Sequence, residues 1–493
     1  MSLTSAMGVT QSALSAFSAE TSVTSRNIAG ANSTGLYSRK SIDVVSSNNS
    51  GVEVLSVTRA QNQALFGDLL GSTAVSAKQD ALSSGLDALY QTIGDTTDSI
   101  SPAALLSNLQ NSLQTLAASP SDMVQAQDVV GKAQALTDGL NNASSTVQSV
   151  RQQADGNMAS SVSTINSLLG QFQTLNTQIV SGGKSGADVT DLLDSRDNIL
   201  QQLSHQVGIT TTSNSDNSMS IFTDSGVTLF QDKARTVTFV PTTTYVAGTI
   251  GNSVMVDGVP ITGKSSPMPI QSGKLAGLAD LRDNVTTTYQ AQLDGIAGTL
   301  INAFAESDQS GATPPAASQP GLFTYSGAPA LPSSLNMTGL AAGIRVNSNV
   351  DPKQGGNLTL LRDGGISDPA STTYTYNTTG AASYVGRLNG MLAAFDQTQS
   401  FSNAANLSTS SSLTDFSTAS AAWLNGQRQS ASTASDYQKT VVSSVTSALS
   451  NATGVSLDTE MSKMLDLEQS YSASAKLMST INTMFQSLLT AVG

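Results

Sequence analysis

Residues 457–492 read LDTEMSKMLDLEQSYSASAKLMSTINTMFQSLLTAV, and apolar side chains recur in this stretch every three or four residues. Two interleaved rows with a seven-residue repeat contain Leu457, Met464, Tyr471, Met478 and Phe485 in the first and Leu467, Ile481 and Leu488 in the second. Rows of this kind are typical of a coiled-coil helix. The stretch therefore predicts a helix that pairs with another helix.

The N-terminal end carries a weaker form of the same pattern, at Leu3, Met7, Leu14, Phe17 and Ile28. Both ends are rich in Ser and Thr, which are poor helix formers, so neither is expected to be stable as an isolated helix. We therefore predict that the two ends pair as a terminal coiled coil and become ordered only on docking. These two sets of residues are the predicted seam for self-assembly.

Composition excludes several classes of function. The 493 residues, 39% of them hydrophobic, are enough for several domains with cores of their own. A net charge of -13 argues against binding to nucleic acid or to an anionic membrane. The chain has no cysteine, which removes disulfides and thiol chemistry. Neither end has the roughly 18 apolar residues of a membrane helix or the basic start of a secretory signal.

The spacing of the apolar residues changes along the interior of the chain. Ser101 and Pro102 form a helix start signal, and a second signal at residues 119–121 opens a helix predicted to reach about residue 180, about 90 Å long. From Ile209 the period is two, and the Asp257-Gly258 pair predicts a hairpin. Residues 308–333 are rich in Pro, Gly and Ser, and strand-like sequence follows at 344–346, 358–361 and 374–376.

We therefore expect a mainly α fold with a β-rich insertion, arranged as an elongated multidomain rod. The predicted terminal coiled-coil domain comprises residues 1–30 and 455–493. The predicted helical rod domain comprises 31–208, 271–306 and 383–454. The predicted β-rich outer domain comprises 209–270 and 307–382.

One motif suggests an enzyme, because residues 258–265 (GVPITGKS) match the phosphate-binding loop pattern. That loop functions between a buried strand and a helix N-terminus. Pro267 and Pro269 oppose a helix here, so we interpret the segment as a β-turn. A nucleotide-binding enzyme that uses Lys264 and Ser265 is kept as a less favoured alternative.

Other polar candidates are interpreted as structural. Asp191, Asp194 and Asp197 could in principle offer oxygens to a cation, but we interpret them as a solvated acidic helix face. His205 is the only histidine and has no catalytic constellation near it in the sequence, and Trp423 is expected to pack between helices. We therefore predict no catalytic residue, no metal site, no cofactor and no enzymatic activity.

Residues 25–40 (SRNIAGANSTGLYSRK) give the most specific signal. They resemble the N-terminal signature of bacterial flagellar axial proteins, with matches at Asn27, Ile28, Ala29, Asn32, Gly35, Tyr37, Ser38 and Arg39. Leu36 is an insertion relative to that signature, and Ser33-Thr34 replaces a common Thr-Pro. Asn and Gly tolerate left-handed backbone, so the segment is expected to end the terminal helix.

Residues 37–39, 191–197, 454–461 and 469–476 are further similar to the hook-associated protein 1 family. The resemblance implies a structural, self-assembling protein at the junction between hook and filament, extracellular after export by the flagellar type III system. Its implied partners are other copies of itself, the hook protein, hook-associated protein 3 and an export chaperone. A hook or distal-rod protein is the alternative within this class, and an adhesin that displays the β-rich middle is another possibility.

Overall fold

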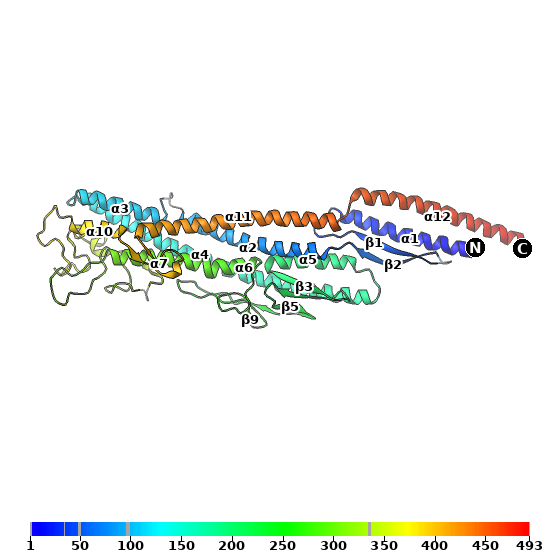
Figure 1. The fold of residues 1–493 in the computed structure, drawn as a ribbon, viewed down its shortest axis with the longest axis horizontal. Coiled ribbons are helices and arrows are strands. Elements are labelled where there is room, and N and C mark those ends of the chain that lie inside the picture. Colours follow the sequence, from blue (N-terminus) through cyan, green and yellow to red (C-terminus); the bar gives the residue numbers. More distant parts are fainter. Residues whose placement is uncertain (1, 34, 48–50, 95–98, 334–336, 493) are drawn as a thin grey trace.

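The computed structural model describes residues 2–33, 35–47, 51–94, 99–333 and 337–492. The molecule is elongated, and both chain termini lie at the same end of it (Figure 1). Long helices run nearly parallel to the long axis, and the strands form small sheets beside them. The fold is therefore mainly α, as the sequence predicts.

Six helices make up most of the rod: α2 (Gln63–Ile93), α3 (Pro102–Ala118), α4 (Met123–Lys184), α5 (Thr190–Gln206), α7 (Thr286–Ala303) and α11 (Leu413–Thr453). The start signal at Ser101 and Pro102 is confirmed, whereas the signal at 119–121 is not: Ser119 is the C-cap of α3, and the long helix begins at Met123. The side chain of Ser101 accepts a hydrogen bond from the N–H of Ala104 with Pro102 in the first turn, and Asp122 caps α4. Helix α4 has 62 residues and is about 93 Å long at 1.5 Å per residue.

The core of the rod follows the apolar rows of these helices. Leu109 and Leu113 of α3 and Leu136 and Leu140 of α4 are all 0% exposed. A fully buried side chain of this kind contributes about 1.5–3 kcal/mol. The apolar rows of the rod are thus buried against other residues of the same chain.

The segment 274–303, which belongs to the rod, contains an irregular helix. Helix α6 (Lys274–Asp280) passes into the π-helix η1 (Leu281–Val285) and then into α7. Arg282 of η1 is 0% exposed and donates to Asp155 of α4 and to Asp283. Asp155 also accepts from the Tyr245 hydroxyl at 2.8 Å. These bonds attach Tyr245, a residue of the predicted outer domain, to the rod.

Residues 209–260 form two antiparallel sheets. The first has the order β3 (Ile209–Ser213), β4 (Met219–Thr223), β5 (Thr228–Gln231) and β6 (Lys233–Ala234). The second has the order β7 (Val237–Thr238), β8 (Met255–Val256) and β9 (Val259–Pro260). The predicted hairpin is confirmed, because Asp257 and Gly258 have φ values of 47° and 84° between β8 and β9.

In the described part of residues 304–412 the strands are only two residues long, shorter than the sequence pattern predicts. The elements are β10 (Phe323–Thr324), α8 (Leu340–Gly343), β11 (Arg345–Val346), η2 (Ser348–Val350), η3 (Pro352–Gln354), α9 (Leu360–Asp363), α10 (Gly386–Asp396), β12 (Gln399–Ser400), η4 (Asn403–Ala405) and β13 (Ser410–Ser411). The strand-like stretch at 358–361 instead enters the helical turn α9, and 374–376 makes only the bridge from Thr375 to Gly364. Asn and Asp side chains and backbone turns satisfy the backbone there, so no extended ladder forms.

The chain ends form the remaining part. Helix α1 (Leu3–Gly30) and helix α12 (Leu457–Val492) lie side by side, and the hairpin of β1 (Lys40–Ser47) and β2 (Gly51–Arg59) lies along α1 (Figure 1). The sequence analysis did not predict this hairpin. We call α1 and α12 the terminal pair, and we call residues 31–39, 60–62 and 454–456, which connect it to the rod, the joint.

Candidate assembly site

The terminal pair brings most of the predicted seam residues together. The five predicted residues of α1 are all half-buried, as are four of α12: Met464, Met478, Ile481 and Phe485. Leu467 of α12 is 6% exposed and lies at the centre of the contact. The two ends, more than 400 residues apart in sequence, therefore do meet as helices within one chain.

Three predicted seam residues lie outside this contact. Leu457, Tyr471 and Leu488 are 37%, 48% and 58% exposed. In the first row Met464, Met478 and Phe485 are half-buried while Leu457 and Tyr471 are exposed, and Ser470 and Ser474 are half-buried near the middle of α12. Leu457, Tyr471 and Leu488 are thus not covered by α1 within one chain, and their place in a seam between copies stays a prediction.

Helix α12 also exposes apolar side chains that the heptad rows do not contain. Met461, Leu465, Leu477, Met484 and Leu489 are between 53% and 70% exposed. Together with Leu488 we call them the exposed apolar residues of α12. In the described part of α12, Leu467 and Glu460 are the buried residues. Most of this helix is thus uncovered in the single chain.

The signature residues form a buried polar cluster where α1 ends. Asn27 is 1% exposed, its amide nitrogen donates to the Lys40 carbonyl at 2.8 Å and to Glu460 at 3.1 Å, and its oxygen accepts from the Lys40 N–H at 2.9 Å. Glu460 of α12 also pairs with Arg39 at 2.7 Å. The N–H of Arg39 donates to the Thr453 carbonyl of α11. The signature therefore attaches α1, β1, α11 and α12 to one another.

Gly30, which lies between the signature residues Ala29 and Asn32, packs closely against Tyr37 of the signature. A Cβ on Gly30 would lie 2.5 Å from the ring of Tyr37. The Lys40 ammonium lies 3.8 Å from the centroid of the same ring. The remaining signature residues are less buried: Ile28, Tyr37 and Ser38 are half-buried, whereas Ala29, Asn32 and Gly35 are exposed.

The acidic row of α5 is not a solvated face, so that interpretation is wrong. Asp191 pairs with Arg26 and Lys40, Asp194 pairs with Lys40 and Arg59, and Asp197 pairs with Arg59, at distances from 2.5 to 3.0 Å. The side chains of Lys40 and Asp194 are 0% and 8% exposed. Arg26 of α1 and Lys40 and Arg59 of the β1–β2 hairpin thus bind three carboxylates on one helix of the rod. The sequence analysis did not predict this ion-pair network, because the partners are more than 130 residues apart.

Burial and charge act in opposite directions on these groups. Desolvation works to raise the pKa of Asp191, but the hydrogen bonds and charges of Lys40 and Arg26 hold it below the ordinary value. Asp188, which pairs with Arg26 at 2.6 Å, has a lowered pKa for the same reasons. Burial raises the pKa of Asp197, and its pairing with Arg59 only partly offsets this effect. The cations of the network therefore favour the ionised forms of Asp188 and Asp191.

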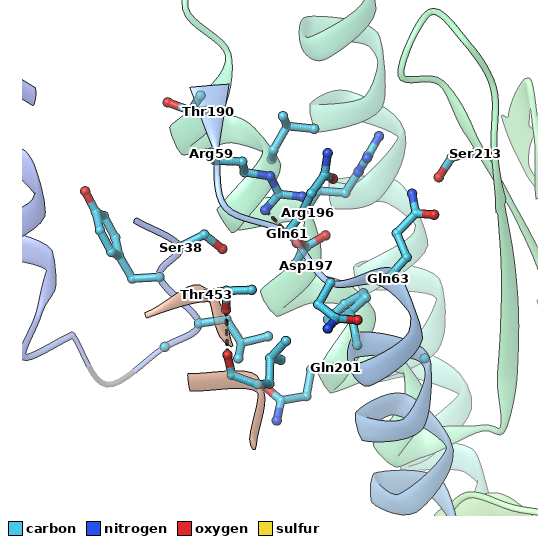
Figure 2. A pocket seen from close by; sticks show the side chains of 18 of the residues that line it. Ser38, Arg59, Gln61, Gln63, Thr190, Arg196, Asp197, Gln201, Ser213 and Thr453 are labelled. Carbon is cyan, nitrogen blue, oxygen red and sulfur yellow. Dashed lines mark hydrogen bonds and ion pairs between the residues drawn. The ribbon is translucent and has the colours of Figure 1, made fainter. Parts of the chain in front are cut away.

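A groove with a volume of 1310 Å³ lies at the joint (Figure 2). Its walls come from residues 30–38, the end of β2 and the start of α2, helix α5, strand β3 and the last turns of α11. Arg59 lies in this wall with its guanidinium toward Asp197 (Figure 2). The groove thus opens between the terminal part and the rod.

Arg196 is the unusual side chain of the groove. It is 3% exposed, and one guanidinium nitrogen donates to the Asn217 carbonyl at 2.6 Å. Its Nε has no hydrogen-bond partner, and among the described residues no carboxylate lies within ion-pair distance of it. Burial lowers the pKa of Arg196 to about 10. An unpaired buried cation leaves the groove able to accept an anionic group.

The other sequence candidates lie away from the joint groove. Residues 258–265 form the β8–β9 turn and strand β9, and the next helix begins only at Lys274, so the strand-loop-helix context of a phosphate-binding loop is not present. His205 has a pKa lowered by burial and by Lys274, and Trp423 stacks on Tyr289 at 6.5 Å. In the part of the chain that the structure describes, no three acidic or histidine side chains gather as a metal site. Within the same residues, no helix combines the length and apolarity needed to cross a bilayer.

Comparisons with known proteins place the chain among the axial proteins of the bacterial flagellum. Residues 86–321 match the family described as "Flagellar hook-associated protein FlgK helical domain", and residues 447–491 match "Flagellar basal body rod FlgEFG protein C-terminal". The chain belongs to the flagellar hook-associated protein 1 family. It is a structural component of the flagellum that self-assembles and associates with other flagellar components.

Two curated relatives agree with this membership. The chain is 23% identical to flagellar hook-associated protein 1 of Bacillus subtilis over 98% of this chain and 97% of the relative. It is 28% identical to the protein of the same name from Escherichia coli, over 45% of this chain and 41% of the relative. A solved structure of the flagellar hook junction protein FlgK from Burkholderia pseudomallei is 24% identical with a TM-score of 0.42, covering 52% of this chain and 46% of that one.

Proposed function

We propose that this chain polymerises through its terminal pair as the junction between hook and filament. The observation that carries the proposal is the exposed apolar residues of α12, because the rod buries its own apolar rows and the terminal pair does not. Each such side chain contributes about 1.5–3 kcal/mol when a neighbouring copy covers it fully. Part of that free energy offsets the cost of association.

We further propose that the chain has three functional regions with the boundaries predicted from the sequence. Residues 1–30 and 455–493 make the contacts between copies. Residues 31–208, 271–306 and 383–454 form the rod, and 209–270 and 307–382 form an outer domain. The helix break at Gly454 and the three non-helical segments of the joint support the first boundary.

The proposed partners are the hook protein on one side of the junction and hook-associated protein 3 on the other. An export chaperone covers α12 before secretion and prevents premature pairing between copies. The exposed apolar residues of α12 support this step, since such a surface would aggregate in the cell. The final location is extracellular, after export by the flagellar type III system.

We propose no enzymatic role. Lys264 follows a turn rather than a strand that leads into a helix, so the less favoured nucleotide-binding interpretation has lost its structural support. A hook or distal-rod protein remains the alternative within the class, because residues 447–491 match a segment described for rod and hook proteins. Deletion distinguishes them: loss of a junction protein leaves hooks without filaments, whereas loss of a hook or rod protein leaves no hook. An adhesin would instead lose its function when residues 209–270 are removed.

The decisive test uses Leu488→Asp, because Leu488 lies outside the contact with α1. The variant is expected to keep the fold of the free chain and to abolish filament attachment in cells, seen as bare hooks by electron microscopy. Leu467→Asp and Ile481→Asp, within the terminal pair, are expected to abolish attachment as well. Thr440→Asp on the exposed side of α11 adds the same charge and should leave motility unchanged. Normal filaments with Leu488→Asp would refute the proposal.

A further inference from the structure

Strand β3 has an open edge that faces the joint groove. The sheet order places β3 at one end, and only β4 pairs with it. The bonds from the Asp224 N–H to the Gly208 carbonyl and from the Asn214 N–H to the Ser218 carbonyl fix the alternation along the pair. Thr211 and Ser213 therefore direct their backbone groups away from β4, toward the groove that both residues line. No partner for these groups lies among the described residues.

Strand β1 of the terminal hairpin has a second open edge. The bond from the Ala60 N–H to the Arg39 carbonyl fixes the alternation here, and Ile42 and Val44 direct their N–H and C=O groups outward. The opposite edge, on β2, is partly covered by α1, because the Val52 N–H donates to the Ser12 hydroxyl. Within the described residues, Ile42 and Val44 have no such partner. Open strand edges are templates for pairing with another chain.

The side chains of the hairpin fit the groove in polarity and charge. Val44, Val45, Val54 and Leu55 are 37–60% exposed, which is unusual for β-branched and aliphatic residues in a strand. The groove offers apolar surface from Leu36, Val57, Phe66, Leu193 and Met219.

Two acidic side chains of the hairpin complement the groove cation. Asp43 and Glu53 are exposed, and neither has an ion-pair partner among the described residues. Arg196 is the buried cation without a carboxylate in the groove. A carboxylate of the hairpin would therefore supply the partner that Arg196 lacks.

We propose that the β1–β2 hairpin of one copy binds in the joint groove of a second copy by adding strand β1 to the open edge of β3. The two-stranded hairpin and the four-stranded sheet then form one continuous sheet across the subunit boundary. The groove volume exceeds the roughly 300–1,000 Å³ typical of small-molecule sites, which favours a chain segment over a small anion. This contact is additional to that of the terminal pair, and it rests on the proposed assembly into a junction.

Cysteine cross-linking tests the contact, because the chain has no native cysteine. Flagella are isolated from cells in which Val44→Cys/Ser213→Cys replaces the chain, and a short bis-maleimide is added. The expected result is a ladder of dimers and larger species on a denaturing gel, with monomer only when the dilute free chain is treated. The control Val44→Cys/Thr440→Cys, with its second thiol on α11, should remain monomeric.

The outcomes separate this contact from the proposed function. Attached filaments in the Val44→Cys/Ser213→Cys cells show that the junction has formed. If they are present and the chain stays monomeric, or is linked only to a different protein, the hairpin contact is refuted while the function stands. If hooks are absent altogether, the proposed function fails.

Blocking one edge gives a second, independent measurement. Thr211→Pro removes an N–H that β4 does not use, so the fold is expected to tolerate it. Loss of one edge hydrogen bond is expected to lower the cross-linking yield about fivefold in the Val44→Cys/Ser213→Cys background. Thr211→Val keeps the N–H and should give the original yield. Equal yields for the Pro and Val variants would overturn the pairing of β1 with β3.

Discussion

Glu460 attaches the terminal pair to the joint, and its removal allows a quantitative test. Its side chain is 1% exposed and accepts from the amide of Asn27 at 3.1 Å and from the guanidinium of Arg39 at 2.7 Å. Asn27 belongs to α1 and Arg39 to the joint, whereas Glu460 belongs to α12. We predict that Glu460→Ala weakens the attachment of α12 without unfolding the rod.

The magnitude follows from the burial of each partner. Asn27 is 1% exposed and would be left with one unsatisfied amide hydrogen, which costs about 1–3 kcal/mol. The Arg39 side chain is 42% exposed and can rehydrate, so its lost ion pair contributes less than about 1 kcal/mol. The expected total is about 2 kcal/mol, which corresponds to about a 30-fold increase in the opening equilibrium.

Hydrogen exchange on the free chain measures that equilibrium directly. Amides in the first turns of α12 and the last turns of α1 are expected to exchange about 30-fold faster in Glu460→Ala. Amides at the centre of α4 should be unchanged, because the rod core does not contact Glu460. Glu460→Gln keeps the size of the side chain and one acceptor oxygen, so its effect should be smaller.

The matched control is Glu468→Ala, two turns further along the same helix. Glu468 is exposed and has no ion pair among the described residues. It removes the same charge from α12, so it is expected to leave exchange at the α1 end unchanged. If Glu468→Ala and Glu460→Ala accelerate exchange equally, the change reflects net charge and the reasoning about buried bonds is refuted.

Three further predictions concern the joint and the rod. The pKa values of Asp188 and Asp191 are lowered, so their stabilisation is fully present above the ordinary value near 4 and is lost as pH falls through the folded values. The protection factors of amides at the joint, which are corrected for the intrinsic pH dependence of exchange, should fall below about pH 4. Asp155→Ala removes one of the two carboxylates that Arg282 of η1 contacts and leaves Asp283 in place, so it is expected to cost about 1–3 kcal/mol in thermal unfolding. An unchanged Tm would contradict this. Gly277→Ala places a Cβ 2.4 Å from a backbone carbonyl of α2 and should destabilise the rod. Gly131→Ala meets nothing within 4 Å and should stabilise the rod by about 0.5–1 kcal/mol. Similar changes in Tm for both variants would show that close packing does not determine the effect of a substitution at these glycines.

Regular patterns in the sequence predicted the long-range pairing of the ends well. The apolar repeat of residues 457–492 identified Leu467 as part of a seam, and Leu467 is the most buried apolar residue of that helix. The same repeat does not describe Tyr471 and Leu488, which are 48% and 58% exposed in the single chain, whereas Met478 and Phe485 of the same helix are half-buried. Start signals such as Ser101-Pro102 succeeded because a cap is a local interaction.

The polar site of the joint could not be predicted in the same way. Asp194 looks like a surface residue in sequence, and its burial depends on Lys40 and Arg59, which reach it through the β1–β2 hairpin. The Ser, Asn and Gly residues at 46–51 mark the turn of that hairpin but do not indicate which helix its cations contact. One indication was present: acidic side chains at 191, 194 and 197 on one helix face repel one another unless cations approach them. The charge row was therefore visible, but its partners were not.

The 62 unbroken residues of α4 determine how mechanical load passes through a subunit. Successive turns are linked by backbone hydrogen bonds, so a twist applied at one end of this helix reaches the other with no compliant loop in between. Compliance is then concentrated where three stretches of non-helical chain cross together at residues 31–39, 60–62 and 454–456. A rotating bent hook would deform each subunit at the joint, and the two sheets of residues 209–260 would move together with the rod as one rigid body.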